Sequence, residues 1–400
     1  MKRLLILILI TLLGLSFAYA QPAQPEPQLS SEPKQQEVKK EEKKDDKPEV
    51  KIEFTVFSGY LYNPSTVQNN STNFNSFYLN RAFVDFKVDF KNGIRLRVTP
   101  DVNPTTSGWI LRLRHAFVDV SVIRDLLLVS GGITRTEWIG YVDEFVGMRY
   151  ITLSPADRFR LRSSVDIGVS LTLTPMKGFE VFAGIFDGNG FSRGSDDVQT
   201  IQVVTNFRIV GNNLVMTVTT NQLNYINVSK EIGTRVVIAP VYLLTGDTNF
   251  LNMVVALHTY NTILTPDMTN ASGTELYGIG IGINYSPIRV FSEYSVYTTI
   301  LQNVSSTHGN YFGILGKLNF GFVGLKEVSL VGAYYLLEPN VAIQDDERSY
   351  YLGGIEYTLN RNFSISLNAK IDQRKEGYRD FNNNKVDHQT TINVDTLIRL

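Results

Sequence analysis

The chain has 400 residues, of which 38 are Lys or Arg, 39 are Asp or Glu and none is Cys. The lack of cysteine excludes disulfide scaffolds, zinc–thiolate sites and cysteine nucleophiles. A formal net charge of −1 argues against a nucleic-acid-binding protein, which normally has a strongly basic face. The 20 Tyr and 23 Phe exclude a disordered chain, because disordered chains are poor in aromatic residues.

Residues 1–20 have the layout of a secretory signal peptide. Lys2 and Arg3 precede an apolar run over 4–15, and Ala18-Tyr19-Ala20 provides small residues at the expected cleavage site. The apolar run is shorter than the roughly 20 residues that a spanning helix needs, so an N-terminal anchor is the less favoured alternative. We therefore expect an exported protein that is cleaved after Ala20.

Residues 21–49 are rich in Pro, Gln, Glu and Lys and contain no aromatic residue. Such a composition cannot bury enough apolar surface to fold alone. The sequence predicts a disordered periplasmic linker over 21–49, with a dedicated interaction site as the alternative.

From residue 50 onward, apolar and polar residues alternate. One example is the alternation of Tyr277, Ile279, Ile281, Ile283 and Tyr285 with Gly278, Gly280, Gly282 and Asn284. The pattern recurs at 165–174 and 363–372, and a period of two places every second residue on one face of a strand. The alternating runs last about 10 to 14 residues, which is typical of membrane strands rather than the shorter strands of soluble proteins.

Short and long connections also alternate along the chain. In lipid every backbone polar group needs a partner within the protein, so a membrane sheet has to close. The sequence predicts an all-β fold, a transmembrane antiparallel β-barrel over 50–400 with about 18 strands and both ends on the periplasmic side. Two of these strands flank a predicted turn at 210–212. Sixteen strands remain possible if 109–134 is over-split. A barrel of this size leaves a water-filled channel.

Arginine is concentrated in one part of the chain, since eleven of the 21 arginines lie between Arg81 and Arg162. An arginine at the lipid midplane costs about 2–4 kcal/mol, so these side chains are expected to face inward. The predicted pore-lining, anion-attracting residues are Arg81, Arg95, Arg97, Arg112, Arg114, Arg158, Arg160 and Arg162. Arg112 and Arg114 share the parity of Val118 and Val120, so they face inward only if a β-bulge intervenes.

Two interpretations of the arginines remain open: they attract anions, or they only stiffen the wall by pairing with carboxylates. The carboxylates in question are Asp85, Asp89, Asp119 and Asp166. Arg158, Arg160 and Arg162 share the parity of Asp166 and are expected on the wall if that strand begins before Val165.

The longest predicted connection, 135–163, contains many large apolar residues that are poorly suited to water. We expect this third external loop to fold into the barrel and to constrict it. Its predicted constriction residues are Arg135, Glu137, Trp138, Tyr141, Asp143, Glu144 and Arg149. The alternative is a loop that packs across the barrel top or against a neighbouring subunit.

Three segments resemble bacterial outer-membrane porins of the phosphate-selective O/P type. They are Arg81–Asp85 (RAFVD), Ser164–Val169 (SVDIGV) and Ala183–Gly190 (AGIFDGNG), and the resemblance covers about residues 77–195. It implies a trimeric, passive, anion-preferring porin. Val165 stands where the family often has Arg. Because lysine is sparse in these lumen strands, no dedicated phosphate ladder is carried over.

The sequence therefore predicts a porin for passive diffusion of small hydrophilic solutes, with a preference for phosphate-like anions. We expect the outer membrane of a Gram-negative-type bacterium, lipid and solutes or anions as partners, a homotrimer, and no nucleic acid. We expect no catalytic residue, cofactor or metal, because the histidines lack metal-ligand spacing. A barrel enzyme resembling an outer-membrane phospholipase and a plugged structural or adhesin barrel are the alternatives.

Overall fold

The computed structural model describes residues 47–64, 74–90, 92–105, 108–188, 200–210, 213–223, 230–263, 272–301, 306–343, 345–375 and 389–400. The expected signal peptide, residues 1–20, and the expected linker up to residue 46 lie outside the described residues.

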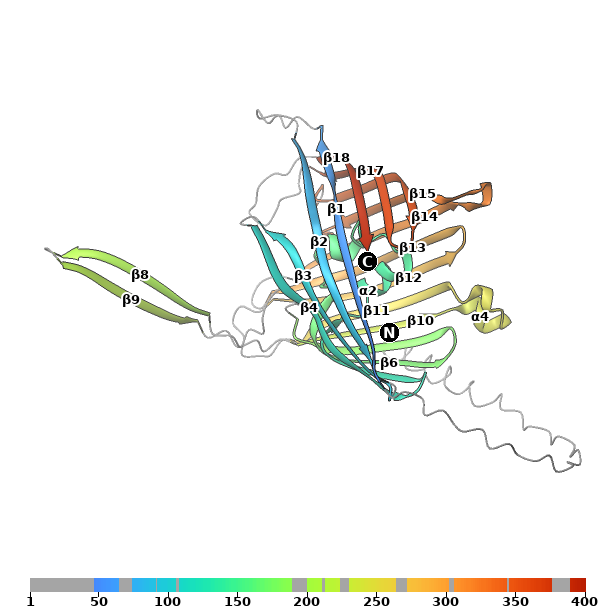
Figure 1. Cartoon of the computed structure of the whole chain (residues 1–400), viewed down its shortest axis with the longest axis horizontal. Helices are drawn as coiled ribbons and strands as arrows, with labels where there is room; N and C mark the ends of the chain where they lie inside the picture. Colours follow the sequence, from blue (N-terminus) through green and yellow to red (C-terminus); the bar gives the residue numbers. More distant parts are fainter. Residues whose placement is uncertain are drawn as a thin grey trace, which may run out of the picture. The chain divides into compact units, whose positions relative to one another are not determined.

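Within the described residues, sixteen antiparallel strands close into one barrel (Figure 1). They are β1 (Glu49–Asn63), β2 (Phe74–Asp89), β3 (Ile94–Thr105), β4 (Gly108–Ile123), β5 (Leu127–Arg135), β6 (Val165–Met176), β7 (Phe179–Phe186), β10 (Lys230–Ile238), β11 (Met253–Ile263), β12 (Ser272–Tyr285), β13 (Ile288–Leu301), β14 (Thr307–Phe320), β15 (Leu325–Glu338), β16 (Arg348–Asn360), β17 (Phe363–Arg374) and β18 (Gln389–Arg399). The first and last strands pair, with Val56 opposite Ile398, so the barrel has no free edge.

Two further strands, β8 (Thr200–Val210) and β9 (Asn213–Leu223), form a separate two-stranded sheet. The prediction of about 18 barrel strands is therefore wrong and the sixteen-strand alternative is confirmed, but for a different reason. Residues 109–134 do hold two strands, β4 and β5. The extra pair is β8 and β9, the strands on either side of the predicted turn at 210–212, and β7 pairs directly with β10. Alternation predicts that a segment is a strand, but it does not specify the neighbour with which that strand pairs.

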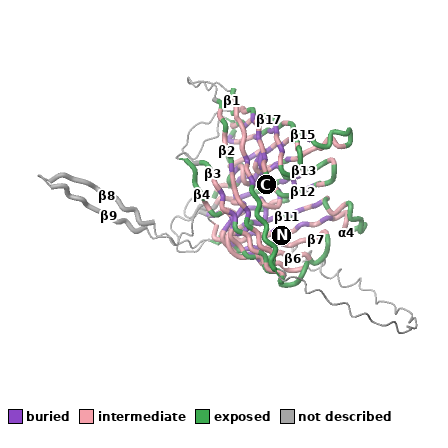
Figure 2. Tube along the Cα trace, viewed as in Figure 1, coloured by how far each residue is buried: buried purple, intermediate pink, exposed green. Residues whose placement is uncertain are grey.

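Alternate residues of each barrel strand face outward, and these are largely apolar. In β12 the outward residues Tyr277, Ile281 and Tyr285 are 47%, 57% and 57% exposed, whereas Leu276 on the opposite face is fully buried. Buried residues recur at every second position along much of β10, β11 and β15, and buried and more exposed stretches mix along the barrel strands in Figure 2. The amphipathic alternation read from the sequence thus separates an apolar outer face from an inner face.

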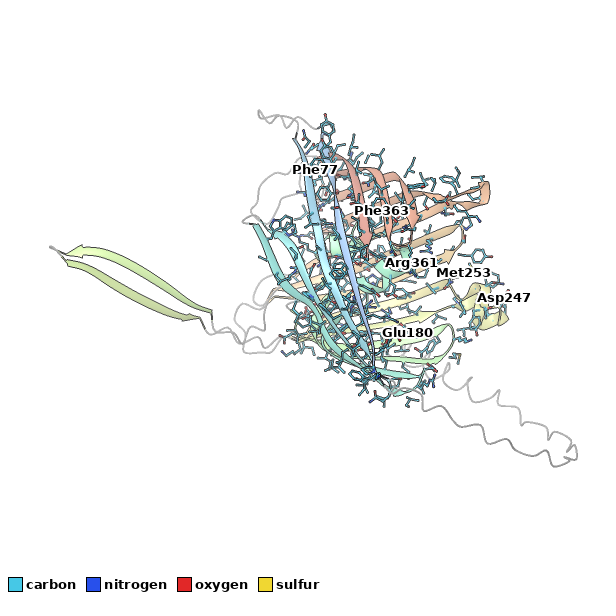
Figure 3. All side chains as sticks on the ribbon, viewed as in Figure 1. Phe77, Glu180, Asp247, Met253, Arg361 and Phe363 are labelled. Atoms are coloured by element: carbon cyan, nitrogen blue, oxygen red, sulfur yellow. The ribbon has the colours of Figure 1, made fainter. Side chains whose placement is uncertain are left out.

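The connections at one end of the barrel are short. Only Ser286 and Pro287 join β12 to β13, and only Arg361 and Asn362 join β16 to β17. The connection between β10 and β11 is longer and contains the short helix α4 (Pro240–Thr245) and the 3-10 turn η1 (Thr248–Phe250). The short connection between β14 and β15 contains a further 3-10 turn, η2 (Gly321–Val323). Figure 3 labels Asp247, Met253 and Arg361, which belong to this end. In the described part of the chain, no helix is long and apolar enough to cross a membrane.

The connection between β5 and β6 lies inside the barrel. This inward segment, residues 136–164, contains the helices α2 (Ile139–Val146) and α3 (Pro155–Arg158). Ile139, Val142 and Val146 have no exposed surface and belong to one apolar cluster with inward residues of the wall. The expected inward-folding third loop is confirmed. Folding into the barrel removes its apolar side chains from water, which is energetically favourable.

Candidate functional site

The inward segment folds as two short helices with well-defined ends. Helix α2 stops at Gly147, whose φ of 71° is left-handed and whose N–H donates to the Asp143 carbonyl at 2.9 Å. Glycine adopts this conformation without steric cost, which ends the helix and turns the chain. Pro155 occupies the first turn of α3, where its missing N–H would have no helical partner.

One side of the segment is anchored to the wall formed by β11, β12 and β13. The Trp138 indole stacks on the His258 ring, with centroids 3.7 Å apart and an interplanar angle of 16°. Its Nε1 donates a hydrogen bond to the Glu293 carboxylate. All three side chains are buried, so the contact fixes the start of α2 against the wall.

Glycines on the inner face of β12 make room for these aromatic side chains. A Cβ atom at Gly280 would lie 2.9 Å from Trp138 Cη2, and one at Gly282 would lie 2.6 Å from Phe145 Cζ. Both distances are shorter than real Cβ contacts, so a larger residue at either position would displace these aromatic side chains. Sequence reasoning recorded this glycine row as the face opposite the isoleucines, but it did not identify the row as the seat of the loop.

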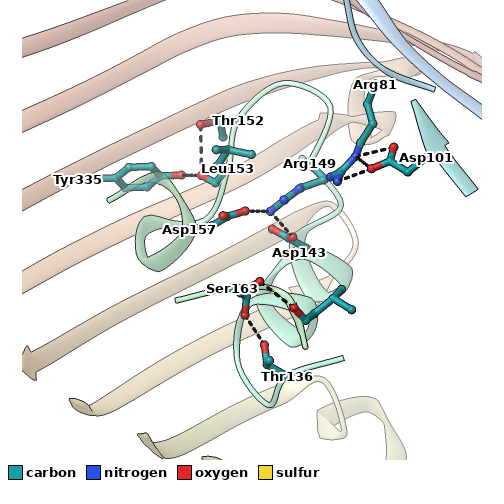
Figure 4. Close-up of polar contacts among 11 residues, drawn as sticks. Arg81, Asp101, Thr136, Asp143, Arg149, Thr152, Leu153, Asp157, Ser163 and Tyr335 are labelled. Atoms are coloured by element: carbon teal, nitrogen blue, oxygen red, sulfur yellow. Dashed lines mark hydrogen bonds and ion pairs between the residues drawn. The ribbon is translucent and has the colours of Figure 1, made fainter. Parts of the chain in front are cut away.

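The other end of the segment is held by hydrogen bonds to β15, β16 and β17. The Tyr335 hydroxyl donates to the Leu153 carbonyl at 2.8 Å, a bond drawn in Figure 4. The Tyr150 hydroxyl donates to Glu356 at 2.6 Å, and Arg158 pairs with Asp372 at 3.1 Å. The segment therefore crosses the barrel from β5 and β6 to the far wall and divides the interior.

Within the segment, Arg149 bridges two carboxylates. Its Nη1 lies 2.7 Å from Asp143 and 2.5 Å from Asp157 (Figure 4). Burial raises the pKa of Asp143 to about 6, even though the Arg149 guanidinium acts in the opposite direction. Asp143 is thus the group of this triad that can change charge near neutral pH.

The wall of β2, β3 and β4 opposite the segment carries ion pairs. Arg81 pairs with Asp101 at 2.8 Å, as Figure 4 shows, and Arg97 pairs with Asp85 at 2.8 Å. Two looser pairs are Arg95–Asp119 at 3.2 Å and Arg112–Asp101 at 3.5 Å. The expected partners Asp85 and Asp119 are thus present, whereas Asp101 was not foreseen. Asp166 accepts backbone N–H bonds from Ile167 and Gly188.

A β-bulge turns the remaining wall arginines inward. Thr99 is opposite His115 but Pro100 is opposite Leu113, so Arg114 is the extra residue of β4. Beyond the bulge the parity reverses: Leu113 is 41% exposed on the outer face, while Arg112 and Arg114 are half-buried. Pro100 supplies no N–H to the ladder, which suits a place where pairing is interrupted. The β-bulge that the inward placement of Arg112 and Arg114 required is therefore present.

Arg158, Arg160 and Arg162 do not extend a wall strand, so the condition for their expected place on the wall is not met. Strand β6 begins only at Val165, and the three arginines belong to the inward segment because the chain turns there. Arg158 ends α3, and Arg160 is exposed with a left-handed φ of 57°. Arg162 is buried, pairs with Glu137 and lies 3.6 Å over the Tyr260 ring.

The residues expected in the constriction occupy two different environments. Glu137 and Trp138 have no exposed surface, so they face the wall behind the segment and not the open interior. Arg135 and Glu144 pair at 3.2 Å and are accessible, and both line a cavity together with Tyr141. The burial of Glu137 and Trp138 could not be inferred from their spacing in the sequence, because it depends on which wall the segment contacts.

Two cavities flank the segment on the side of the arginine wall. One has a volume of about 700 Å³, and we call it the arginine cavity. Among described residues it is lined by five arginines and two carboxylates: Arg81, Arg112, Arg149, Arg160, Arg162, Asp157 and Glu231. The other, of about 520 Å³, is lined by Arg95, Arg135 and Arg235 among its charged residues, together with three carboxylates. Within the described chain no three His, Asp or Glu side chains gather as metal ligands.

Comparison with known proteins identifies the fold but not a family. No family model and no curated protein matches the sequence. An anion-selective porin from Comamonas acidovorans is similar in structure, with a TM-score of 0.59 and 12% identity over 88% of this chain and 100% of that chain. The trimer form of OmpT, an outer-membrane protein of Vibrio cholerae, gives a TM-score of 0.54 and 12% identity over 89% and 100% of the two chains.

A third similar structure is OmpF of Salmonella typhi, with a TM-score of 0.53 and 9% identity over 88% of this chain and 97% of that chain. The likeness covers the barrel almost completely in each case. The chain therefore has the fold of the porin-like β-barrels. The resemblance to phosphate-selective O/P porins is not established by these matches.

Proposed function

We propose that the chain is an outer-membrane porin that lets small hydrophilic solutes diffuse passively and prefers anions. The single observation that supports this most strongly is the arginine cavity, where five arginines face two carboxylates next to the segment that narrows the barrel. Four of these arginines also pair with carboxylates behind the lining: Arg81 and Arg112 with Asp101, Arg149 with Asp143, and Arg162 with Glu137. The exposed Arg160 therefore carries most of the attraction for anions, which raises their local concentration.

The location of the arginines matters as much as their number. Charges in water are screened beyond about 8 Å at physiological salt, so only a narrow passage discriminates between ions. The inward segment provides such a passage because it brings Arg149 and Arg160 to face Arg81 and Arg112 across one cavity. A wide barrel with the same wall but no inward segment would select poorly.

Membrane insertion and assembly belong to the same proposal. The apolar outer face of a closed barrel suits the outer membrane, which the expected signal peptide would allow the chain to reach. A homotrimer is consistent with the trimer form of the similar Vibrio cholerae protein. Chloride and phosphate are the anions to compare, because the sequence resemblance points to a phosphate-like solute.

Conductance of refolded protein in a planar bilayer tests the proposal. We expect steps that grow with salt concentration and a reversal potential in a salt gradient that shows anion preference. Arg160→Gln should lower the preference, whereas Arg361→Gln makes the same charge change at the exposed β16–β17 turn and should leave it unchanged.

Each alternative makes a different prediction in this experiment. A plugged barrel or a barrel enzyme would give no salt-dependent steps, and that result would contradict the porin function. If the current steps of Arg160→Gln and of the unaltered protein show the same ion preference, the channel function stands, but the arginine cavity does not determine the preference.

A further inference from the structure

A smaller cavity, of about 330 Å³, lies where the inward segment faces β16, β17 and β18. The segment contributes Tyr150 and Arg158, and the wall contributes Asp372 and Asn393 among others. This volume is within the range of small-molecule sites, which begins at roughly 300 Å³. The cavity is therefore large enough for a solute and not only for water.

The charged lining residues of this cavity are all paired, whereas the arginine cavity includes the exposed Arg160. Asp372 accepts from Arg158 at 3.1 Å, and Asp395 accepts from Lys370 at 2.9 Å. These two pairs are the charged groups among its described lining residues. Asp372 is bound in addition by Arg348, at 2.5 Å. Each charged lining residue thus already has a partner of opposite charge, which leaves the uncharged polar groups of the lining to bind an uncharged solute.

The uncharged lining groups are those that bind hydroxyls. Asn80 and Gln389 are exposed amides, and each can donate and accept hydrogen bonds. Tyr78 is half-buried, and its hydroxyl donates to Asp395, which fixes the ring. An immobilised tyrosine offers a flat apolar face beside polar groups, and the ring of a sugar has matching apolar and hydroxylated faces.

One buried acceptor in the cavity lacks a donor. Asn393 is 2% exposed, and its Nδ2 donates to Thr391 at 3.3 Å. Its Oδ1 has no hydrogen-bond partner among the described residues. Buried polar atoms are nearly always paired, so this acceptor is a place where a hydroxyl group of a solute would be favoured.

We propose that this cavity binds an uncharged, polyhydroxylated solute of the size of a mono- or disaccharide. The Asn393 side-chain carbonyl accepts from one hydroxyl group of the solute, and Asn80 and Gln389 contact others. The inward segment provides different residues to this cavity and to the arginine cavity, and Asn80 of the wall lines both. The inference rests on the proposed channel function, since the solute reaches the cavity through the lumen.

The test adds D-glucose or maltose to refolded channels in a planar bilayer. We expect a saturable decrease in ion current at concentrations on the order of 100 mM, as for a weak site. Glycine betaine, which has no hydroxyl group, is the matched osmolyte and should change the current only through viscosity.

Asn393→Leu keeps the size of the side chain but removes the acceptor, and should weaken sugar binding about fivefold, as expected for one hydrogen bond. Each block is normalised to the variant's own conductance.

Arg160→Gln is the comparison variant in the arginine cavity, and it should leave the sugar block unchanged while it lowers anion preference. Channels that conduct but show no sugar block would overturn the sugar site and leave the porin function standing. A block that is equal in Asn393→Leu, or one that Arg160→Gln abolishes, would also overturn the assignment. If no conductance appears, the porin function fails, and titration of detergent-solubilised protein with D-glucose then decides the site separately.

Discussion

Two walls of the barrel face the inward segment and differ in chemistry. The wall of β2, β3 and β4 presents arginines paired with aspartates, whereas β12 presents a row of glycines. The first wall borders the cavities, and the second is covered by Trp138 and Phe145. The inward segment thus packs on a recessed wall that holds it, and it faces a charged wall with which it forms the passage.

The largest effect should come from removing the anchor on the glycine wall. Trp138→Ala leaves a void against His258 and Phe291 and should lower the free energy of unfolding by about 3–5 kcal/mol. Urea unfolding in detergent, followed by electrophoresis without boiling, measures the change. Leu244→Ala removes a side chain that is 87% exposed and serves as the control with little expected effect. A stable Trp138→Ala barrel with unchanged conductance would show that the anchor does not fix the segment.

Filling the recess should have the next largest effect. Gly280→Val places atoms where Trp138 and Phe291 lie and should cost about 1–3 kcal/mol, with a change in single-channel conductance as the segment shifts. The matched control is Gly353→Val, because a Cβ atom there meets nothing within 4 Å. Equal behaviour of the two valine variants would refute the role of the glycine row.

The charged wall should respond more weakly in stability and more strongly in selectivity. Arg81→Gln leaves the fully buried Asp101 with only the looser Arg112 contact, and should cost about 1–3 kcal/mol. Arg95→Gln, whose side chain is 53% exposed, should change stability by less than about 1 kcal/mol. Both should reduce the anion preference in reversal-potential measurements. A stability loss that is larger for Arg95→Gln than for Arg81→Gln would contradict this order.

The smallest effect should be a pH dependence that arises in the segment itself. The pKa of Asp143 is raised to about 6 by burial, so it takes up a proton between pH 7 and pH 5 and leaves Arg149 less neutralised. Anion preference should therefore increase at pH 5. Since the folded chain binds this proton more tightly than the unfolded chain, Asp143 contributes stability at low pH that is lost as pH rises from about 4 to 6. Asp143→Asn should reduce both changes, and an unaltered pH response would exclude Asp143.

The barrel could be predicted from the sequence because alternation and strand length are local properties. The bulge at Arg114 was foreseen as a condition, since a lumen arginine and an outward Val118 cannot share one parity. The placements of Glu137 and Arg162 were not predictable, because their burial depends on strands more than 90 residues away, such as β11 with Tyr260. The same limit explains β8 and β9, whose alternation carries no information about their neighbours.

Trp138 stacks on His258 and donates a hydrogen bond to Glu293, and these contacts have a consequence for how the chain folds. Trp138 precedes Glu293 by 155 residues, so the indole can reach its place only after the first half of β13 has joined the barrel. Contacts so distant in sequence form slowly. Until β13 is in place, the apolar side chains of the inward segment lack the wall that covers them, so we expect folding intermediates without β13 to expose this apolar surface.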